Sequence, residues 1–154
     1  RVVVVVSRHD NMIHNNVHRN DEEIPTAHIL YPQEVNAAIS DSSSPVSVVR
    51  VIGRLTHYDS KNSRATIEWN HQELNVATNL VEPMPAGLVV GNLVEFVGSI
   101  ERHRSGPGGE GEVRARTCRG VEGLDMALFE RALKMRRNFL DNLQNVDKLA
   151  LGDL

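Results

Sequence analysis

Four arginines surround a glycine-rich segment of the chain. Arg102 and Arg104 precede it, at the end of one apolar run, and Arg114 and Arg116 follow it in the next. Side chains two positions apart in a strand share a face, so Arg114 and Arg116 project together. Guanidinium groups beside an extended backbone can follow the phosphates of a nucleic-acid strand. The spacing predicts a basic hairpin with phosphate contact as its chemistry.

Base stacking would need aromatic side chains, and the chain has only one Trp, two Tyr and three Phe. Trp69, Tyr58 and Phe96 lie in expected strands, where stacking on bases and filling a core are both open to them. Phe96 is expected in the core. The polar atoms of Trp69 and Tyr58 suit a wet edge, so both remain candidates for nucleic-acid contact, together with Arg54 on the polar face of its strand.

Acid–base catalysis is the alternative chemistry. The available groups are His57, Asp59, Glu68, His71 and Glu73, which lie at expected strand ends and turns. They have no nucleophile motif, phosphate loop or metal signature around them. We therefore expect a protein that is not an enzyme.

Metal binding also lacks the necessary residues. His14 and His18 are four positions apart, yet Asn15 and Asn16 between them favour turns, and no carboxylate or cysteine completes a site. The single cysteine, Cys118, cannot form an intramolecular disulfide, which fits a reducing compartment. We expect no metal and no other cofactor.

Composition limits the kinds of partner. The 154 residues suit one domain, and the formal net charge of −3 lacks the strongly basic balance of a protein that grips nucleic acid unaided. The valine run near the start is too short to span a bilayer, so no membrane contact is expected. Any contact with DNA must be local or shared.

Five short β segments occupy the middle of the chain. They alternate between apolar and polar residues, and Gly53 and Gly98 at the centres of two of them favour a curled sheet. This order predicts a mainly β fold with a five-stranded closed barrel, an architecture that usually binds rather than catalyses. The expected segments are 48–59, 64–70, 72–78, 92–103 and 112–119.

The barrel has expected flanking segments on both sides. Residues 1–23 are polar and are expected to form a disordered extension. A short helix or turn is expected between Ile24 and Ala38, packed on one end of the barrel. The domain should cover residues 24–145, with a tail over 146–154.

An amphipathic helix should follow the last strand, from about Met126 to Leu143. Asp125 is placed to cap it, and Leu124 can pack on Phe129 as a hydrophobic staple. Leu128, Phe129 and Leu133 in the first turns are expected to cover the barrel.

The apolar stripe of this helix is wider than one contact needs, so its later part is expected to bind a partner. Met135, Phe139 and Leu143 recur at every fourth position and lie further from the barrel. The predicted partner-binding residues are Ala132, Met135, Arg136, Phe139, Leu140 and Leu143.

Several motifs, in their order, resemble the Ten-one family, the smallest subunit of the CST telomere complex. The resemblance runs from about Ile29 to Phe139. The most specific pieces are LVEP at Leu80–Pro83 and VEGLD at Val121–Asp125. The other matching pieces are GRLTHYD, VGNLVEFVGSIERH and VRARTCRGVEGLDMALFERAL.

This resemblance implies an oligonucleotide/oligosaccharide-binding (OB) barrel that binds the N-terminal OB domain of the middle CST subunit through its C-terminal helix. It further implies a place beside the large CST subunit on single-stranded telomeric DNA in the nucleus, where the complex caps chromosome ends and supports DNA polymerase α-primase. Phe139 matches the aromatic of the family's partner-facing helix, whereas Leu143 stands at a basic position. Arg114 and Arg116 match a basic pair of the last strand.

Two alternatives remain at the level of sequence. The smallest subunit of replication protein A is similar in its barrel, its GRL-type first strand and its C-terminal helix, and would bind a different middle subunit. A pure assembly module that touches no nucleic acid is the second, and the net acidity favours it. If the barrel contributes only Arg102, Arg114 and Arg116 to a groove shared with a partner, we expect the isolated chain to bind DNA weakly and in a salt-sensitive way.

Overall fold

The computed structural model describes residues 26–103 and 111–151. The expected extension over residues 1–23, the pair His14 and His18, and Arg104 lie outside the described residues.

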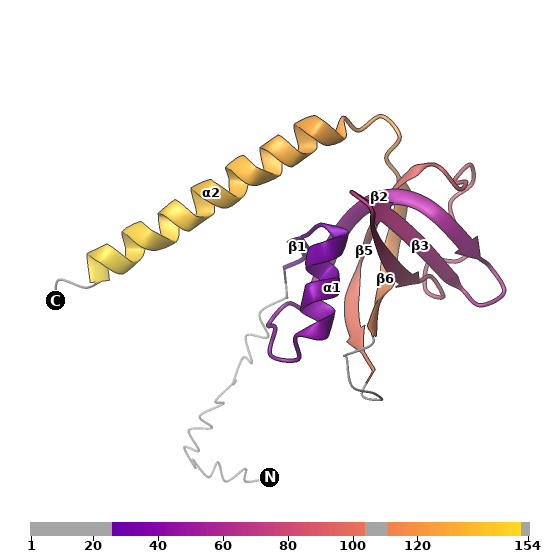
Figure 1. Cartoon of the computed structure of the whole chain (residues 1–154), viewed down its shortest axis with the longest axis horizontal. Helices are drawn as coiled ribbons and strands as arrows, with labels where there is room; N and C mark the ends of the chain where they lie inside the picture. The colour runs from indigo at the N-terminus through magenta and orange to yellow at the C-terminus, as the bar shows by residue number, and fades with distance from the viewer. Residues whose placement is uncertain (1–25, 104–110, 152–154) are drawn as a thin grey trace, which may run out of the picture.

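Six strands form one sheet that closes on itself. The order is β1-β2-β3-β4-β6-β5, and an additional antiparallel pairing of β2 with β5 closes the barrel. β1 pairs with β2 and β4 pairs with β6 in parallel, while the other pairs are antiparallel. The strands are β1 (His28–Ile29), β2 (Val48–Asp59), β3 (Arg64–Trp69), β4 (Gln72–Ala77), β5 (Leu93–Arg102) and β6 (Gly111–Gly120) (Figure 1).

The predicted mainly β, five-stranded OB barrel is confirmed, and each expected segment matches a strand within one residue at either end. The short strand β1 was not expected, because two residues carry no alternation that a sequence could show. The inward positions of β2 are Val49, Val51 and Leu55, all buried. Phe96 is fully buried among them, as predicted, and is one of the largest core side chains.

Gly98 is required by a close approach of two backbones. A Cβ atom there would overlap the carbonyl of Arg114 and lie 2.8 Å from the Cα of Ala115. The pairing of β5 with β6 also shifts register between Val97 and Gly98, as a bulge does. The glycine therefore lets β6 bend tightly against β5 where the barrel curls.

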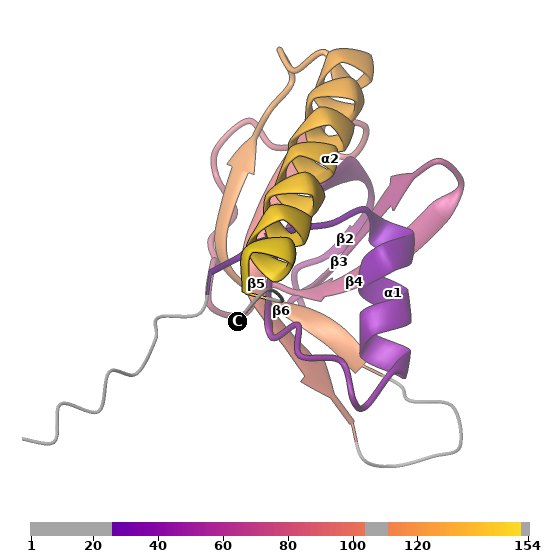
Figure 2. The same cartoon turned by 90° about the vertical axis from the view of Figure 1, so that its left-hand side faces the viewer.

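Helix α1 (Pro32–Ser40) packs on the barrel in the expected region, with Val35 and Ile39 in the core cluster. Figure 2 shows it beside the barrel wall. Arg102 on β5 donates hydrogen bonds to the carbonyl of Ala38, from Nη2 at 2.8 Å and from Nε at 3.3 Å. The positive charge of Arg102 near the last turn of α1 interacts favourably with the negative end of the helix dipole and so stabilises the helix.

The LVEP motif ties the long loop after β4 to the β2–β3 hairpin. The carboxylate of Glu82 accepts hydrogen bonds from the hydroxyls of Thr78 (2.9 Å), Ser63 (3.0 Å) and Tyr58 (3.3 Å). Tyr58 also packs against the main core. Hydrogen bonds to Glu82 of the motif therefore hold the loop against the β2–β3 hairpin, and Tyr58 donates one of them.

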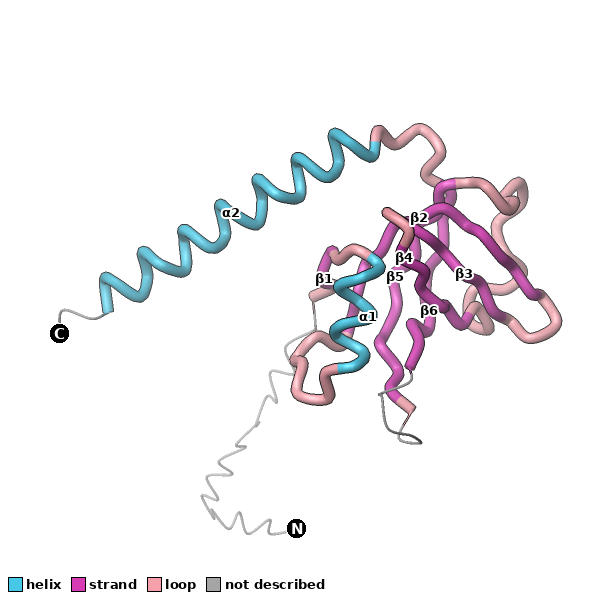
Figure 3. The backbone as a smooth tube through the Cα atoms, viewed as in Figure 1, coloured by secondary structure: helices cyan, strands magenta, loops and turns pink. Residues whose placement is uncertain are grey.

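Helix α2 (Met126–Leu151) extends away from the barrel, so that its C-terminal end lies far from the strands (Figure 3). The helix is longer than the predicted span, which ended at about Leu143, and it includes most of the expected tail over 146–154. The reason is visible in the sequence: no Gly or Pro follows Leu143 until Gly152, so nothing stops the helix earlier.

Candidate partner-binding helix and nucleic-acid contacts

The start of α2 is fixed as the sequence predicts. The N–H of Leu128 donates to Oδ1 of Asp125 at 3.0 Å, which confirms Asp125 as the cap. Leu124 and Phe129 are both partly buried against a second apolar cluster that contains Met126, which agrees with the predicted staple. This cluster also includes Ile52 and Leu93 of the barrel, so the first turn of α2 is packed onto β2 and β5.

Trp69 helps to hold this part of the helix. Its indole Nε1 donates to Oε1 of Glu130 at 2.7 Å, and its ring packs against the Met126 cluster. Asn70 donates to the same carboxylate oxygen at 3.4 Å. In this structure both the polar atom and the ring of Trp69 are engaged inside the protein.

Two faces of α2 have different surroundings. At about 100° of rotation per residue, Met126, Leu133 and Arg137 lie within about 40° of one another. Met126 is buried, Leu133 is only 4% exposed and Arg137 donates a hydrogen bond to the carbonyl of Ile29 in β1. This face of the helix is turned toward the protein.

The outward face carries an apolar stripe, which we call the outer stripe: Leu128, Ala132, Met135, Phe139 and Leu143. By the same rotation these positions fall within about 80° of one another, and their centre lies about 120° around the helix from Leu133. Met135 is 72% exposed and Phe139 62% exposed, and Leu143 is also exposed. Such an uncovered apolar row is unusual on a monomer and is typical of an interaction surface.

The expected division of the helix holds for two of its three early residues. Leu133 is buried and Phe129 is partly buried, but Leu128 is 54% exposed, so its expected place on the barrel is wrong. Leu128 faces the same way as Met135, away from Met126 and Leu133. Arg136 and Leu140, also predicted to bind a partner, are exposed. Arg136 lies beside Leu143 of the outer stripe, whereas Leu140, seven positions after Leu133, lies within about 20° of Leu133 around the helix.

Arg137 makes a contact that the sequence analysis did not find. Its Nη1 and Nη2 donate to the two carboxylate oxygens of Glu34, both at 2.8 Å, and Nη2 also donates to the carbonyl of Ile29 at 2.9 Å. The guanidinium carbon lies 5.2 Å from the ring centroid of Tyr31. Only the position of Arg137 on the Leu133 face could have signalled this contact.

The carboxylate of Glu34 is charged in this arrangement. Burial alone would raise its pKa, but the hydrogen bonds from Arg137 and from the N–H of Tyr31 hold the pKa below its usual value. The same Tyr31 N–H bond, 2.8 Å to Oε2, belongs to the capping box at the start of α1. Glu34 therefore joins the beginning of α1 to the middle of α2.

Most of the arginines predicted to contact nucleic acid make contacts within the protein. Arg54 donates to the carbonyl of Gly91, Arg102 caps α1, and Arg114 pairs with Glu101 at 3.1 Å. Arg116 is exposed on β6. The structure therefore leaves little of the predicted basic hairpin free for phosphates within its described part.

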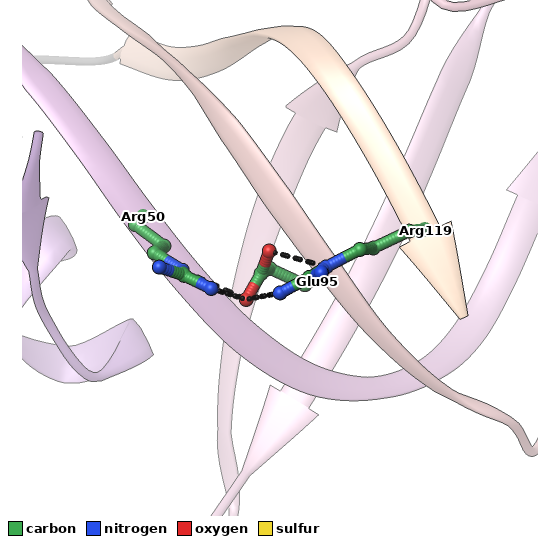
Figure 4. Close-up of polar contacts among 3 residues, drawn as sticks. All are labelled: Arg50, Glu95 and Arg119. Atoms are coloured by element: carbon green, nitrogen blue, oxygen red, sulfur yellow. Dashed lines mark hydrogen bonds and ion pairs between the residues drawn. The ribbon is translucent and has the colours of Figure 1, made fainter. Parts of the chain in front are cut away.

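A charge cluster on the outer wall was not foreseen. Glu95 on β5 is only 5% exposed and lies between Arg50 on β2 and Arg119 on β6 (Figure 4). Arg119 Nε donates to Oε1 at 2.8 Å, and Arg50 Nε donates to Oε2 at 2.8 Å. Burial raises the pKa of Glu95, but the hydrogen bonds from both arginines lower it more, so the net pKa lies below the usual range.

The candidate acid–base residues are spread over the β2–β3–β4 side of the barrel. His57 and Asp59 line one open cleft, and the Asp59 carboxylate accepts bonds from the turn that follows it, at 3.0 Å from the N–H of Lys61. Glu68 lies 3.7 Å from a fully exposed His71, and Glu73 pairs opposite Glu68 in the β3–β4 register.

The thiol of Cys118 is half-buried, and burial raises its pKa to about 11. Among the described residues, no group of three or more His, Cys, Asp or Glu could hold a metal ion. Neither described helix is long and apolar enough to cross a bilayer.

The fold and the uncovered helix define a small OB-fold protein with a surface suited to assembly. The chain belongs to the family of telomere-capping CST complex subunits, whose pattern matches residues 23–143. It is 38% identical over 111 residues to the mouse (Mus musculus) CST complex subunit TEN1, covering 69% of this chain and 66% of that protein, slightly less than two thirds of its length. With the human (Homo sapiens) CST complex subunit TEN1 it shares 35% identity, covering 69% of this chain and 83% of that protein.

Solved structures agree with the fold. The crystal structure of the S. pombe Stn1-Ten1 complex contains a chain that superposes with a TM-score of 0.58 at 14% identity, covering 75% of this chain and 95% of that one. S. pombe Ten1 alone gives a TM-score of 0.56 at 14% identity, over 73% of this chain and 99% of that one. At such low identity the likeness shows the OB fold itself.

Proposed function

We propose that this chain is the small assembly subunit of a CST complex, and that the outer stripe of α2 binds the N-terminal OB domain of the middle subunit. The observation that carries the proposal is the exposure of Met135 and Phe139 on a helix that extends away from its own barrel. Apolar side chains of this size at this spacing suit an apolar groove or a partner helix. Family membership favours the CST middle subunit over its replication protein A counterpart.

The S. pombe relative was crystallised as a Stn1-Ten1 complex, which supports pairwise assembly as the role of this small subunit. Through the middle subunit the chain would join the large CST subunit at telomeres in the nucleus. There it would contribute to capping chromosome ends and, indirectly, to replication by DNA polymerase α-primase. Its main action is to stabilise the middle subunit, and it needs no catalytic residue or cofactor for this.

Contact with single-stranded telomeric DNA is proposed to be weak for the isolated chain and shared in the complex. Arg54, Arg102 and Arg114 already make internal contacts, so few cations are free to release counterions from a strand. Arg116 is the most available of the described candidates.

Co-expression tests the assembly proposal. We expect the N-terminal domain of the middle CST subunit to co-purify with the wild-type chain and to be lost with Met135→Glu/Phe139→Glu, because two buried unpaired charges would oppose docking. The matched control is Lys134→Glu/Asn138→Glu, which adds two carboxylates at exposed positions outside the outer stripe. Capture of the replication protein A domain instead would move the function to general replication. Equal capture of the CST domain by the wild type and the Met135/Phe139 variant would refute the proposal.

The DNA role has its own test. Charge reversal by Arg114→Glu/Arg116→Glu should weaken binding of single-stranded telomeric DNA by the assembled complex and lower its salt dependence. Fluorescence anisotropy at several salt concentrations measures both quantities. Unchanged affinity and salt slope would show that the β6 arginines are not in contact with DNA.

A further inference from the structure

The orientation of α2 relative to the barrel rests on a few side-chain contacts. The helix is anchored at its first turn by the Met126 cluster and by the bond between Trp69 and Glu130. Beyond Leu133, Arg137 ties the helix to the rest of the described protein by hydrogen bonds to Glu34 and to the carbonyl of Ile29. We call the group formed by Arg137, Glu34, Tyr31 and the Ile29 carbonyl the Arg137 clasp.

The clasp connects α2 to the barrel by a short path. Ile29 belongs to β1, which pairs with β2, and the N–H of Leu30 donates to the carbonyl of Arg50 at 3.1 Å. Glu34 lies in the first turn of α1, which packs into the core. Three donated hydrogen bonds and a ring face hold one guanidinium, a fixed planar geometry that a lysine could not reproduce.

The length of α2 explains why the Arg137 clasp matters. At 1.5 Å per residue, Arg137 lies about 18 Å along α2 from the cap at Asp125, and Phe139 about 21 Å. Because Leu133 is also buried, the free part of the helix begins there: a pivot of about 10° at Leu133 would carry Phe139, about 9 Å further along, through about 1.6 Å, and Leu143, about 15 Å along, through about 2.6 Å. Close-packed apolar contacts are sensitive to shifts of this size, so the angle of the helix affects the fit of the outer stripe.

We propose that Arg137 is a positioning residue: the clasp fixes the angle of α2 before assembly and so presents the outer stripe to the middle subunit in its binding geometry. Arg137 does not itself face the partner, because it lies on the Leu133 side of the helix, roughly opposite to Met135. The inference rests on the proposed function of the outer stripe. Its physical basis is preorganisation, since a helix already held in place loses less freedom when it binds.

Two measurements on the full chain test the role of Arg137. Spin labels at Asn62 in the β2–β3 turn and at Asn142 on α2, both exposed, report the helix angle by electron–electron distance measurement in a Cys118→Ser background. We expect one narrow distance distribution in the wild type, a broad one in Arg137→Ala, and a narrow one in the matched control Lys134→Ala. The dissociation constant for the N-terminal domain of the middle CST subunit should rise about tenfold in Arg137→Ala and stay unchanged in Lys134→Ala.

The outcomes separate the two proposals. A distribution in Arg137→Ala as narrow as that of the wild type, or a broad one with unchanged affinity, would overturn the positioning role. Unchanged capture by Met135→Glu/Phe139→Glu would instead overturn the partner site, whatever the helix angle. Where Arg137→Ala does not fold, Arg137→Lys and Glu34→Gln serve, because each keeps side-chain bulk but weakens the paired fork. Intermediate broadening in both, with an intermediate loss of affinity, is then the expected result.

Discussion

Replacing Glu95 by glutamine removes a charge that joins three strands of the barrel while keeping the volume of the side chain. The carboxylate is 5% exposed and accepts from Arg50 on one side and Arg119 on the other. In a fully buried charge network, removing the shared carboxylate would leave both guanidinium groups charged and unpaired, which would cost several kcal/mol. Here the side chains of Arg50 and Arg119 are 39% and 62% exposed, so water can solvate them in the variant. We therefore expect Glu95→Gln to lower the free energy of unfolding by about 1–2 kcal/mol at pH 7.

The pH dependence gives this prediction its sharpest form. The pKa of Glu95 in the folded protein lies below its ordinary value, because the hydrogen bonds from the arginines outweigh burial. A carboxyl whose folded pKa is depressed stabilises the fold fully above its unfolded pKa of about 4.3. That contribution is lost as the pH falls through the folded pKa. The difference between wild type and Glu95→Gln should therefore shrink below about pH 4.

Urea unfolding of both proteins between pH 7 and pH 3, followed by circular dichroism, measures this difference directly. A gap of constant size down to pH 3 would refute the electrostatic explanation and point to packing instead. A gap near zero at pH 7 would show that rehydrated arginines compensate for the loss of the carboxylate. The control is Glu101→Gln, which removes a carboxylate from a partly exposed pair with Arg114 and should change stability by under about 1 kcal/mol.

Two further predictions concern single positions. Gly98→Ala forces a Cβ against the backbone of Arg114 and should lower the free energy of unfolding by about 3 kcal/mol. The control Gly123→Ala has open space around the new Cβ and should change that free energy by under about 0.5 kcal/mol. Equal thermal unfolding of the two variants would contradict the close approach at Gly98. Trp69→Phe keeps an aromatic ring but removes the hydrogen bond to Glu130, so we expect the free energy of unfolding to fall by about 1 kcal/mol and the affinity for single-stranded DNA to stay unchanged. A clear loss of DNA affinity would instead assign Trp69 to base stacking.

Local patterns were sufficient for the barrel strands and for the start of α2. The alternation of apolar and polar residues in β2 marks a half-buried strand wherever it lies in the fold, and Asp125 caps through a bond that spans three residues. The exposure of Met135 and Phe139 could also be anticipated, because a helix that continues past its own core has apolar positions left over.

Other features depend on residues that are distant in sequence. Leu128 was placed on the barrel because the apolar positions of α2 form a broad band, and only the packing of Met126 and Leu133 shows which part of the band faces inward. The sequence could not assign Arg102 or Trp69 to internal contacts either, since their partners Ala38 and Glu130 lie about sixty positions away.

By itself, the sequence determined the closed barrel, the terminal helix and the family, because each depends on short-range periodicity, capping residues or ordered motifs. Tertiary structure alone decided which arginines already have partners within the protein and in which direction α2 points. The pairing of Arg137 with Glu34 and that of Arg50 and Arg119 with Glu95 show the reason. An arginine on a polar face looks the same in sequence whether it meets a phosphate, a solvent molecule or a carboxylate, and only the folded chain supplies the neighbour.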